Sequence, residues 1–175
     1  MEVVERQNGG VFFLYGYGGT CKTFMWNTLD AELRSKRKIV LLVASTEIAK
    51  SSICNIDKKD ELVELLKLTY LIIWDEAPMA NKFFFEVLGK SLKDIMCEIP
   101  QASKNLFGGK VVVFNGDFRQ ILPIVPRGCR FDIVHATINA YHIWDQCKVL
   151  RITKNMCLQS GVSTYNKDEV CIFSE

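Results

Sequence analysis

A glycine-rich segment near the beginning of the chain has the residue types that bind phosphate groups. It lies between an apolar run at 11–15 and an amphipathic stretch that begins at Lys22. In a loop between a strand and a helix, backbone N–H groups surround the phosphates, a lysine reaches the β and γ groups, and a hydroxyl binds magnesium. Lys22 and Thr23 fit these last two roles. The predicted nucleotide-binding residues are Gly16, Gly18, Gly19, Thr20, Cys21, Lys22 and Thr23.

Cys21 departs from the usual pattern of such a loop, which has glycine immediately before the lysine. A side chain there would crowd the phosphates, and a non-glycine residue held at positive φ costs about 1 kcal/mol. A role as an active-site thiol is less favoured, because no partner base is evident in the sequence. We therefore expect Cys21 to weaken nucleotide binding. The simpler alternative, a glycine-rich turn with a fortuitous lysine, is disfavoured by the elements on either side.

Two adjacent carboxylates, Asp75 and Glu76, follow another apolar run, at 70–74. In a fold with a phosphate loop, the ends of such buried strands face the phosphates. Asp75 would hold the magnesium ion that bridges the phosphates, and Glu76 would orient and deprotonate the attacking water. The same pair can lie in a solvated loop after a strand, but the phosphate loop upstream favours the catalytic interpretation.

A third polar segment follows the apolar run at 110–114 and reads Asn115-Gly116-Asp117-Phe118-Arg119-Gln120. A glutamine has both a donor and an acceptor, so Gln120 could contact the γ-phosphate and the attacking water and report hydrolysis to the rest of the molecule. Gly-Asp is also common in ordinary turns, so the segment taken alone leaves that alternative open. The predicted catalytic residues are Lys22, Glu76 and Gln120.

A parallel sheet would bring these segments to one edge. Uninterrupted apolar runs predict strands, and apolar residues at helical spacing predict helices. The predicted strands are 11–15, 39–44, 70–74 and 110–114, and the predicted helices are 22–36, 60–67 and one that Asn81 caps and that runs to Ile95. Continuous apolar strands alternating with helices indicate an α/β fold, with helices on both faces of the sheet and ligands at the carboxyl ends of its strands.

Composition restricts the class of protein further. With 175 residues and 49% hydrophobic composition, we expect a single domain spanning 1–175. The net charge of +2 neither indicates nor excludes binding to nucleic acid. The seven cysteines lack any C-x-x-C spacing, so we interpret them as reduced thiols without a zinc site. No apolar run is long enough to cross a bilayer, and the acidic beginning of the chain does not resemble a targeting segment, so an intracellular location is expected.

Four segments together resemble the Pif family of superfamily 1 DNA helicases, especially the relatives carried by Helitron transposons. The resemblance covers most of 9–158. It implies the first RecA-like domain of a P-loop NTPase, magnesium-dependent ATP hydrolysis, 5′-to-3′ translocation on single-stranded DNA and a nuclear location. Family roles include DNA repair, recombination and telomere maintenance. The four segments are Gly16 to Thr23, Trp74-Asp75-Glu76-Ala77-Pro78-Met79, Gly116-Asp117-Phe118-Arg119-Gln120-Ile121-Leu122-Pro123 and Leu150-Arg151-Ile152-Thr153-Lys154-Asn155-Met156.

Departures from the family pattern support an alternative, a degenerate nucleotide-binding remnant without helicase activity. Besides Cys21, Cys157 stands where the family has an arginine that contacts the γ-phosphate, and a thiol cannot replace its charge or its forked donors. Between Ala44 and Ser52 the family's Gly-Arg-Thr-Ala-His segment, which contacts single-stranded DNA, is missing. No second RecA-like domain follows within the sequence, so this chain alone is not expected to unwind DNA.

Three other features are interpreted as structural. The aromatic triplet at 83–85 is at least partly core rather than a platform for stacked bases. The basic run at 34–38 is interpreted as a solvated helix end, which is more common than a surface that binds DNA phosphates. His135 and His142 are seven residues apart in a predicted helical segment and could share a face, but they lack partners for a metal site.

Overall fold

A five-stranded parallel sheet forms the centre of the described part of the chain. The computed structural model describes residues 9–16, 22–44, 61–99, 102, 104–120 and 122–152. Within these residues the strand order is β2-β3-β4-β1-β5, and every pairing is parallel. The strands are β1 (Gly10–Tyr15), β2 (Ile39–Ala44), β3 (Thr69–Asp75), β4 (Val111–Gly116) and β5 (Lys148–Arg151). The prediction of a parallel α/β sheet is confirmed, and β5 is the strand that the sequence did not reveal.

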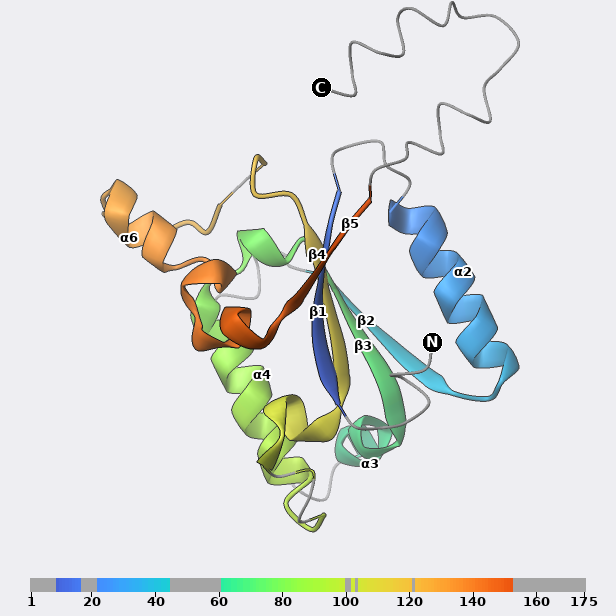
Figure 1. Cartoon of the computed structure of the whole chain (residues 1–175). Coiled ribbons are helices and arrows are strands. Elements are labelled where there is room, and N and C mark those ends of the chain that lie inside the picture. Colours follow the sequence, from blue (N-terminus) through green and yellow to red (C-terminus); the bar gives the residue numbers. More distant parts are fainter. Residues whose placement is uncertain are drawn as a thin grey trace, which may run out of the picture.

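Helices cover both faces of this sheet. Figure 1 shows α2 on one side and α4 on the other, with α6 standing away from the sheet. The α-helices are α2 (Lys22–Ser35), α3 (Glu61–Leu68), α4 (Lys82–Ile95) and α6 (Arg130–His135). The 3-10 helices are η2 (Ala77–Met79), η3 (Leu106–Gly109), η4 (Ile138–Ala140) and η5 (His142–Gln146). The first three α-helices agree with the predicted ones to within two residues.

Alternation along each strand divides the core into two clusters, one on each face of the sheet. On β4, Val112 and Phe114 belong to the cluster that includes α4, whereas Val111 belongs to the cluster that includes α2. On β1, Phe13 and Leu14 divide between the two clusters in the same way. Because successive side chains of a strand point to opposite faces, both sides of these strands must be apolar, which explains their uninterrupted runs.

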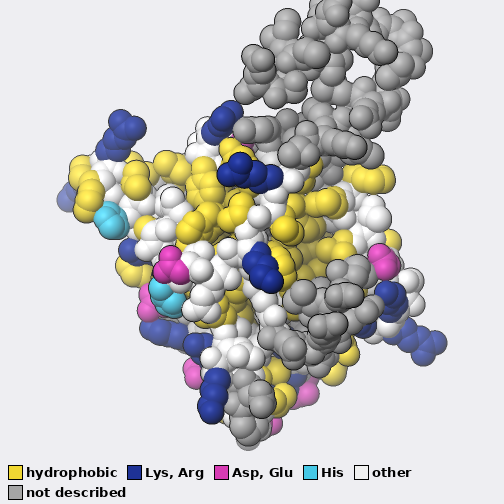
Figure 2. Space-filling model, in the orientation of Figure 1, with side chains coloured by type: hydrophobic (Ala, Val, Ile, Leu, Met, Phe, Trp, Pro, Cys, Tyr) yellow, Lys and Arg dark blue, Asp and Glu magenta, His cyan; other side chains and the backbone are white. Residues whose placement is uncertain are grey.

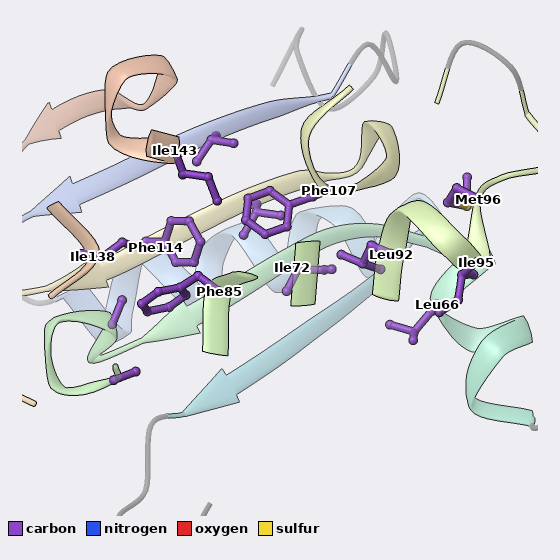
Figure 3. Packing of buried hydrophobic residues seen from close by; sticks show 14 of the residues in the cluster. Leu66, Ile72, Phe85, Leu92, Ile95, Met96, Phe107, Phe114, Ile138 and Ile143 are labelled. Atoms are coloured by element: carbon purple, nitrogen blue, oxygen red, sulfur yellow. The ribbon is translucent and has the colours of Figure 1, made fainter. Parts of the chain in front are cut away.

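Several aromatic rings pack against one another within the cluster under α4, part of which is shown in Figure 3. The ring of Phe85 lies 5.1 Å from that of Phe114 and 5.0 Å from that of Trp74, both edge to face. Asn81 begins α4 by accepting a hydrogen bond from the backbone N–H of Phe83, at 3.2 Å. Phe83 is 61% exposed and Phe85 fully buried, so the structural interpretation of the aromatic triplet is confirmed.

The basic run at the end of α2 consists of solvated side chains. Arg34 pairs with Asp30 at 2.7 Å and Lys36 pairs with Glu32 at 3.4 Å, one helical turn back in each case. Exposed pairs of this kind contribute only a few tenths of a kcal/mol. The interpretation of this segment as a helix end is therefore supported.

The predicted helical segment does not run through both His135 and His142, so these two residues do not share a helix face. His135 ends α6 and His142 begins η5. The helix stops between them because Thr137 has extended backbone angles and its hydroxyl donates to the carbonyl of Val134. Among the described residues no group of three His, Cys, Asp or Glu side chains could hold a metal ion by itself.

Two further expectations concern thiols and membranes. Of the cysteines in the described ranges, Cys97, Cys129 and Cys147 are free thiols. Burial raises the pKa of Cys147 to about 12, so this thiol is unreactive near neutral pH. None of the described helices has both the length and the apolar composition to span a bilayer.

Lys110 links the beginning of β4 to the junction of α3 and β3. Its ammonium is nearly buried and donates to the carbonyl oxygens of Lys67 at 2.6 Å and Thr69 at 2.9 Å. Burial lowers the pKa of this ammonium, so its two charge-assisted hydrogen bonds are partly offset by the cost of desolvation.

Lys110→Met is expected to lower the free energy of unfolding by about 2 kcal/mol, because it leaves two carbonyl oxygens without their donor. Urea unfolding would measure the change. Lys90→Met is the matched control, since Lys90 is exposed and pairs with Glu86 at 2.8 Å. Its expected loss is below about 0.5 kcal/mol. Equal losses in the two variants would contradict the assigned role of Lys110.

Candidate nucleotide-binding site

The carboxyl ends of three neighbouring strands bring the predicted site residues together. β4 lies between β3 and β1, and the register pairs Tyr15 with Gly116 and Trp74 with Phe114. The residues that follow these positions are therefore neighbours at one edge of the sheet. In open parallel sheets this edge is where ligands bind.

Lys22, the first residue of α2, contacts both the loop boundary and the carboxylate pair. Its Nζ donates to the carbonyl oxygen of Gly16 at 3.2 Å and lies 4.0 Å from Oε1 of Glu76. The contact with Glu76 joins segments that are distant in the sequence. The predicted loop residues Gly18, Gly19, Thr20 and Cys21 lie outside the described residues, and Thr23 is described only as part of the backbone of α2.

Asp75 is held by two donors on a single oxygen. Its Oδ1 accepts from the backbone N–H of Glu76 at 3.0 Å and from the side-chain amide of Asn115 at 2.6 Å. Two hydrogen bonds to one oxygen fix the plane of the carboxylate and leave Oδ2 for another ligand. Asn115 had no role predicted from the sequence. The signal that could have identified it is a polar amide at the end of a strand that is otherwise apolar.

Glu76 combines an unusual backbone with an unusual electrostatic setting. It has φ 51° and ψ 41°, the left-handed region, which costs a non-glycine residue about 1 kcal/mol. Burial raises the pKa of its carboxyl, the Lys22 ammonium partly offsets this, and the charges of Asp75 and Asp117 add to the rise. Its Oε2 is buried without a hydrogen-bond partner among the described residues. Local strain and an unsatisfied carboxylate oxygen are typical of functional sites.

Gly116 allows the Glu76 turn to pack on the end of β4. A Cβ at this position would lie 2.2 Å from Cδ of Pro78 and 3.5 Å from the backbone nitrogen of Ala77. Only glycine permits this approach, so Gly116 sets the position of the turn that follows Asp75.

Gln120 lies in a tight turn after β4. Its backbone N–H donates to the carbonyl oxygen of Asp117 at 3.1 Å, and the nearly buried carboxylate of Asp117 accepts from the N–H of Arg119 at 2.9 Å. The side chain of Gln120 is exposed, and no hydrogen bond in the described part of the chain joins it to Lys22, Asp75 or Glu76. Its role as a sensor of the γ-phosphate stays a prediction.

The chemistry of this edge suits a phosphate ester bound with a hard cation. Lys22 supplies positive charge, and Asp75 supplies a carboxylate oxygen, the type of ligand that Mg²⁺ prefers. No group of three His, Cys, Asp or Glu side chains among the described residues could hold an ion alone, and bound Mg²⁺ commonly takes some of its ligands from substrate phosphates.

Comparisons with known proteins identify relatives of this chain. The sequence model of a family described as PIF1-like helicase matches residues 1–53 and 47–175. The ATP-dependent DNA helicase Pif1 of Campylobacter jejuni is 27% identical over 140 residues, which cover 65% of this chain and 29% of that protein. The ATP-dependent DNA helicase Pif1 of Psychrobacter sp. is 27% identical over 144 residues, covering 70% of this chain and 21% of that protein. The chain therefore spans less than a third of either relative.

A solved structure shows the same fold. Pif1 from Bacteroides sp., crystallised in complex with ADP-AlF4, superposes with a TM-score of 0.66 at 20% identity over 98% of this chain and 43% of that one. The described sheet and helices are thus those of a RecA-like helicase domain, as predicted.

Gly116→Ala is expected to lower the free energy of unfolding by about 1–3 kcal/mol and to weaken nucleotide binding, because the new methyl group must displace Pro78 and the Glu76 turn. Urea unfolding and titration with a fluorescent ATP analogue would measure the two effects. The control is Gly89→Ala on α4, whose Cβ would lie 3.6 Å from Cε1 of Phe107, an ordinary contact. If Gly116→Ala changes the free energy of unfolding and the nucleotide affinity no more than Gly89→Ala does, the close approach of Pro78 to Gly116 is not needed.

Proposed function

The chain belongs to the PIF1-like helicase family, and we propose that it forms the ATP-binding RecA-like unit of an ATP-dependent DNA helicase. The observation that carries this proposal is the meeting of Lys22 with the carboxylate pair: Lys22 Nζ lies 4.0 Å from Glu76 Oε1, beside the hydrogen-bonded Asp75. A lysine opening a helix and a strand-end Asp-Glu pair are the parts that hold and hydrolyse a nucleoside triphosphate.

Each part has a proposed role. Lys22 exchanges its bond to the Gly16 carbonyl for the β- and γ-phosphates, while Gly16, Gly18, Gly19, Thr20 and Cys21 surround them with backbone N–H groups. Thr23 and Asp75 hold Mg²⁺, which neutralises phosphate charge when bound. Glu76 orients the attacking water and accepts its proton. Gln120 reports the loss of the γ-phosphate to the rest of the motor.

The direction of movement, the cellular roles and the location are proposed from the likeness to the family. We propose movement in the 5′-to-3′ direction on single-stranded DNA, work in repair, recombination and telomere maintenance, and a nuclear location. One Pif1 from Bacteroides was crystallised bound to single-stranded DNA. On the face seen in Figure 2, the described Lys and Arg side chains are mostly dispersed between hydrophobic and polar groups. We propose weak DNA binding by this unit alone, because the family's segment that contacts single-stranded DNA is missing between Ala44 and Ser52.

The second candidate function is a nucleotide-binding remnant that does not catalyse unwinding. Cys21, in the position of the loop glycine, and Cys157, in the position of an arginine, motivate it. Both lie outside the described residues. The two candidate functions share the same fold and differ in whether the chain hydrolyses ATP.

Nucleotide binding tests the shared premise. Lys22→Ala is expected to weaken binding of a fluorescent ATP analogue by about 10- to 100-fold, because it removes charge-assisted hydrogen bonds to the phosphates. Cys21→Gly is expected to strengthen it. Fluorescence anisotropy with Mg²⁺ measures both, and Lys36→Ala on the exposed end of α2 is the matched control. Equal binding by wild type, Lys22→Ala and Lys36→Ala would overturn the assignment of the phosphate loop.

Turnover separates the two candidates. Glu76→Gln is expected to retain the ATP analogue within a few-fold and to lose about 10²- to 10⁴-fold in steady-state ATP hydrolysis, since the general base is gone. Hydrolysis by the wild type that rises with added single-stranded DNA would exclude the remnant. Absence of hydrolysis in wild type, with recovery in a Cys21→Gly, Cys157→Arg double variant, would instead support it.

A further inference from the structure

We propose that Asn115 is a positioning residue for Asp75, setting the orientation in which that carboxylate meets a divalent cation. Asn115 is 1% exposed near the carboxyl end of β4, and its Nδ2 lies 2.6 Å from Asp75 Oδ1. The inference deepens the proposed function and rests on it. The role differs from those of Lys22 and Glu76, because Asn115 acts through Asp75 and not on the nucleotide.

The strand geometry places Asn115 and Asp75 on the same face of the sheet, opposite the α4 cluster. Phe114 faces the α4 cluster, so Asn115 faces the opposite side, as does Asp75, which follows Trp74 of the same α4 cluster. β3 and β4 are adjacent, and Trp74 pairs with Phe114 in the register, so the next residues of the two strands are neighbours. The contact between amide and carboxylate is therefore built into the pairing of the strands.

The chemistry of the pair fixes which end of the amide faces Asp75. An ionised carboxylate only accepts hydrogen bonds, so the NH₂ group must point toward it. This orientation leaves the amide oxygen, Oδ1, buried and without a partner among the described residues. A buried amide oxygen without a donor costs about 1–3 kcal/mol. Replacement by an apolar residue of similar volume would remove that cost, so stability alone does not favour asparagine here.

The advantage of asparagine at this position lies in the orientation that it gives to the carboxylate of Asp75. With Oδ1 occupied by the Asn115 amide and the Glu76 N–H, rotation of the carboxylate is restricted and Oδ2 is presented to the ligand. Without Asn115, the N–H of Glu76 is the one donor to Oδ1 that remains among the described residues, and the carboxylate can turn. Loss of an outer partner of a metal-binding carboxylate costs about 10- to 100-fold in metal affinity.

The test uses Mn²⁺ as the probe, with a non-hydrolysable ATP analogue, in wild type and in Cys21→Gly. Electron paramagnetic resonance of free Mn²⁺ gives the half-saturating concentration, and nucleotide affinity is also measured in EDTA. Asn115→Leu is expected to raise the half-saturating Mn²⁺ concentration about 10- to 100-fold and leave affinity in EDTA unchanged. Asn105→Leu, on the exposed residue before η3, is the matched control and should change neither.

Each outcome decides the matter. Equal Mn²⁺ binding by Asn115→Leu and wild type would overturn the positioning role and leave the proposed function standing. A parallel loss in EDTA and in Mn²⁺ would show that Asn115 supports only the fold of the site. No Mn²⁺-nucleotide binding in either wild type or Cys21→Gly would overturn the proposed function and the inference with it. Circular dichroism checks folding, and Asn115→Ala, with the same expected shift, replaces the leucine variant if that variant unfolds.

Discussion

The parallel pairing of β4 with β3 on one side and β1 on the other is the constraint on which the site depends. Because all three strands run in one direction, their carboxyl ends meet at a single edge of the sheet. At this edge lie Gly16, the first residue of the predicted phosphate loop, after β1, the Asp75-Glu76 pair at the end of β3, and Asn115 near the end of β4. The 2.6 Å hydrogen bond from Asn115 to Asp75 and the contact of Lys22 with Glu76 both follow from this arrangement.

The core is coupled to the site through the alternation of the strands. Trp74 precedes Asp75 and Phe114 precedes Asn115, and both aromatic rings pack against Phe85 of α4. On each strand, a side chain fixed in the core is followed by a polar side chain that faces the ligand edge. A rigid hydrophobic layer therefore sets the positions of the polar groups, which explains how a site made of distant segments can be held without a disulfide or a structural metal among the described residues.

The sequence predicted the sheet well because its strands are buried on both faces and must be continuously apolar. The sequence did not predict β5, a short edge strand beside β1 whose four residues are exposed, because an exposed strand does not require a continuous run of apolar residues. The same limit applies to the site. The roles of Lys22, Asp75 and Glu76 follow from motif and context, whereas the left-handed backbone of Glu76, the fit of Gly116 against Pro78 and the contact of Asn115 depend on strand neighbours. The predicted helical face with two histidines failed because a local turn at Thr137 ended the helix.

Charge balance at this edge connects the cation to the nucleotide. Within the described residues, Asp75, Glu76 and Asp117 surround a site in which Lys22 contributes the positive charge, and burial together with the two aspartates outweighs Lys22 in raising the pKa of Glu76. A triphosphate would add further negative charge to a partly buried space, where repulsion is screened less than in water. A cation close to Asp75 would compensate this negative charge and, beside Glu76, would favour the ionised form of that carboxyl. In the proposed function, the orientation of Asp75 therefore matters for hydrolysis as well as for binding, because a cation held there would place positive charge beside Glu76.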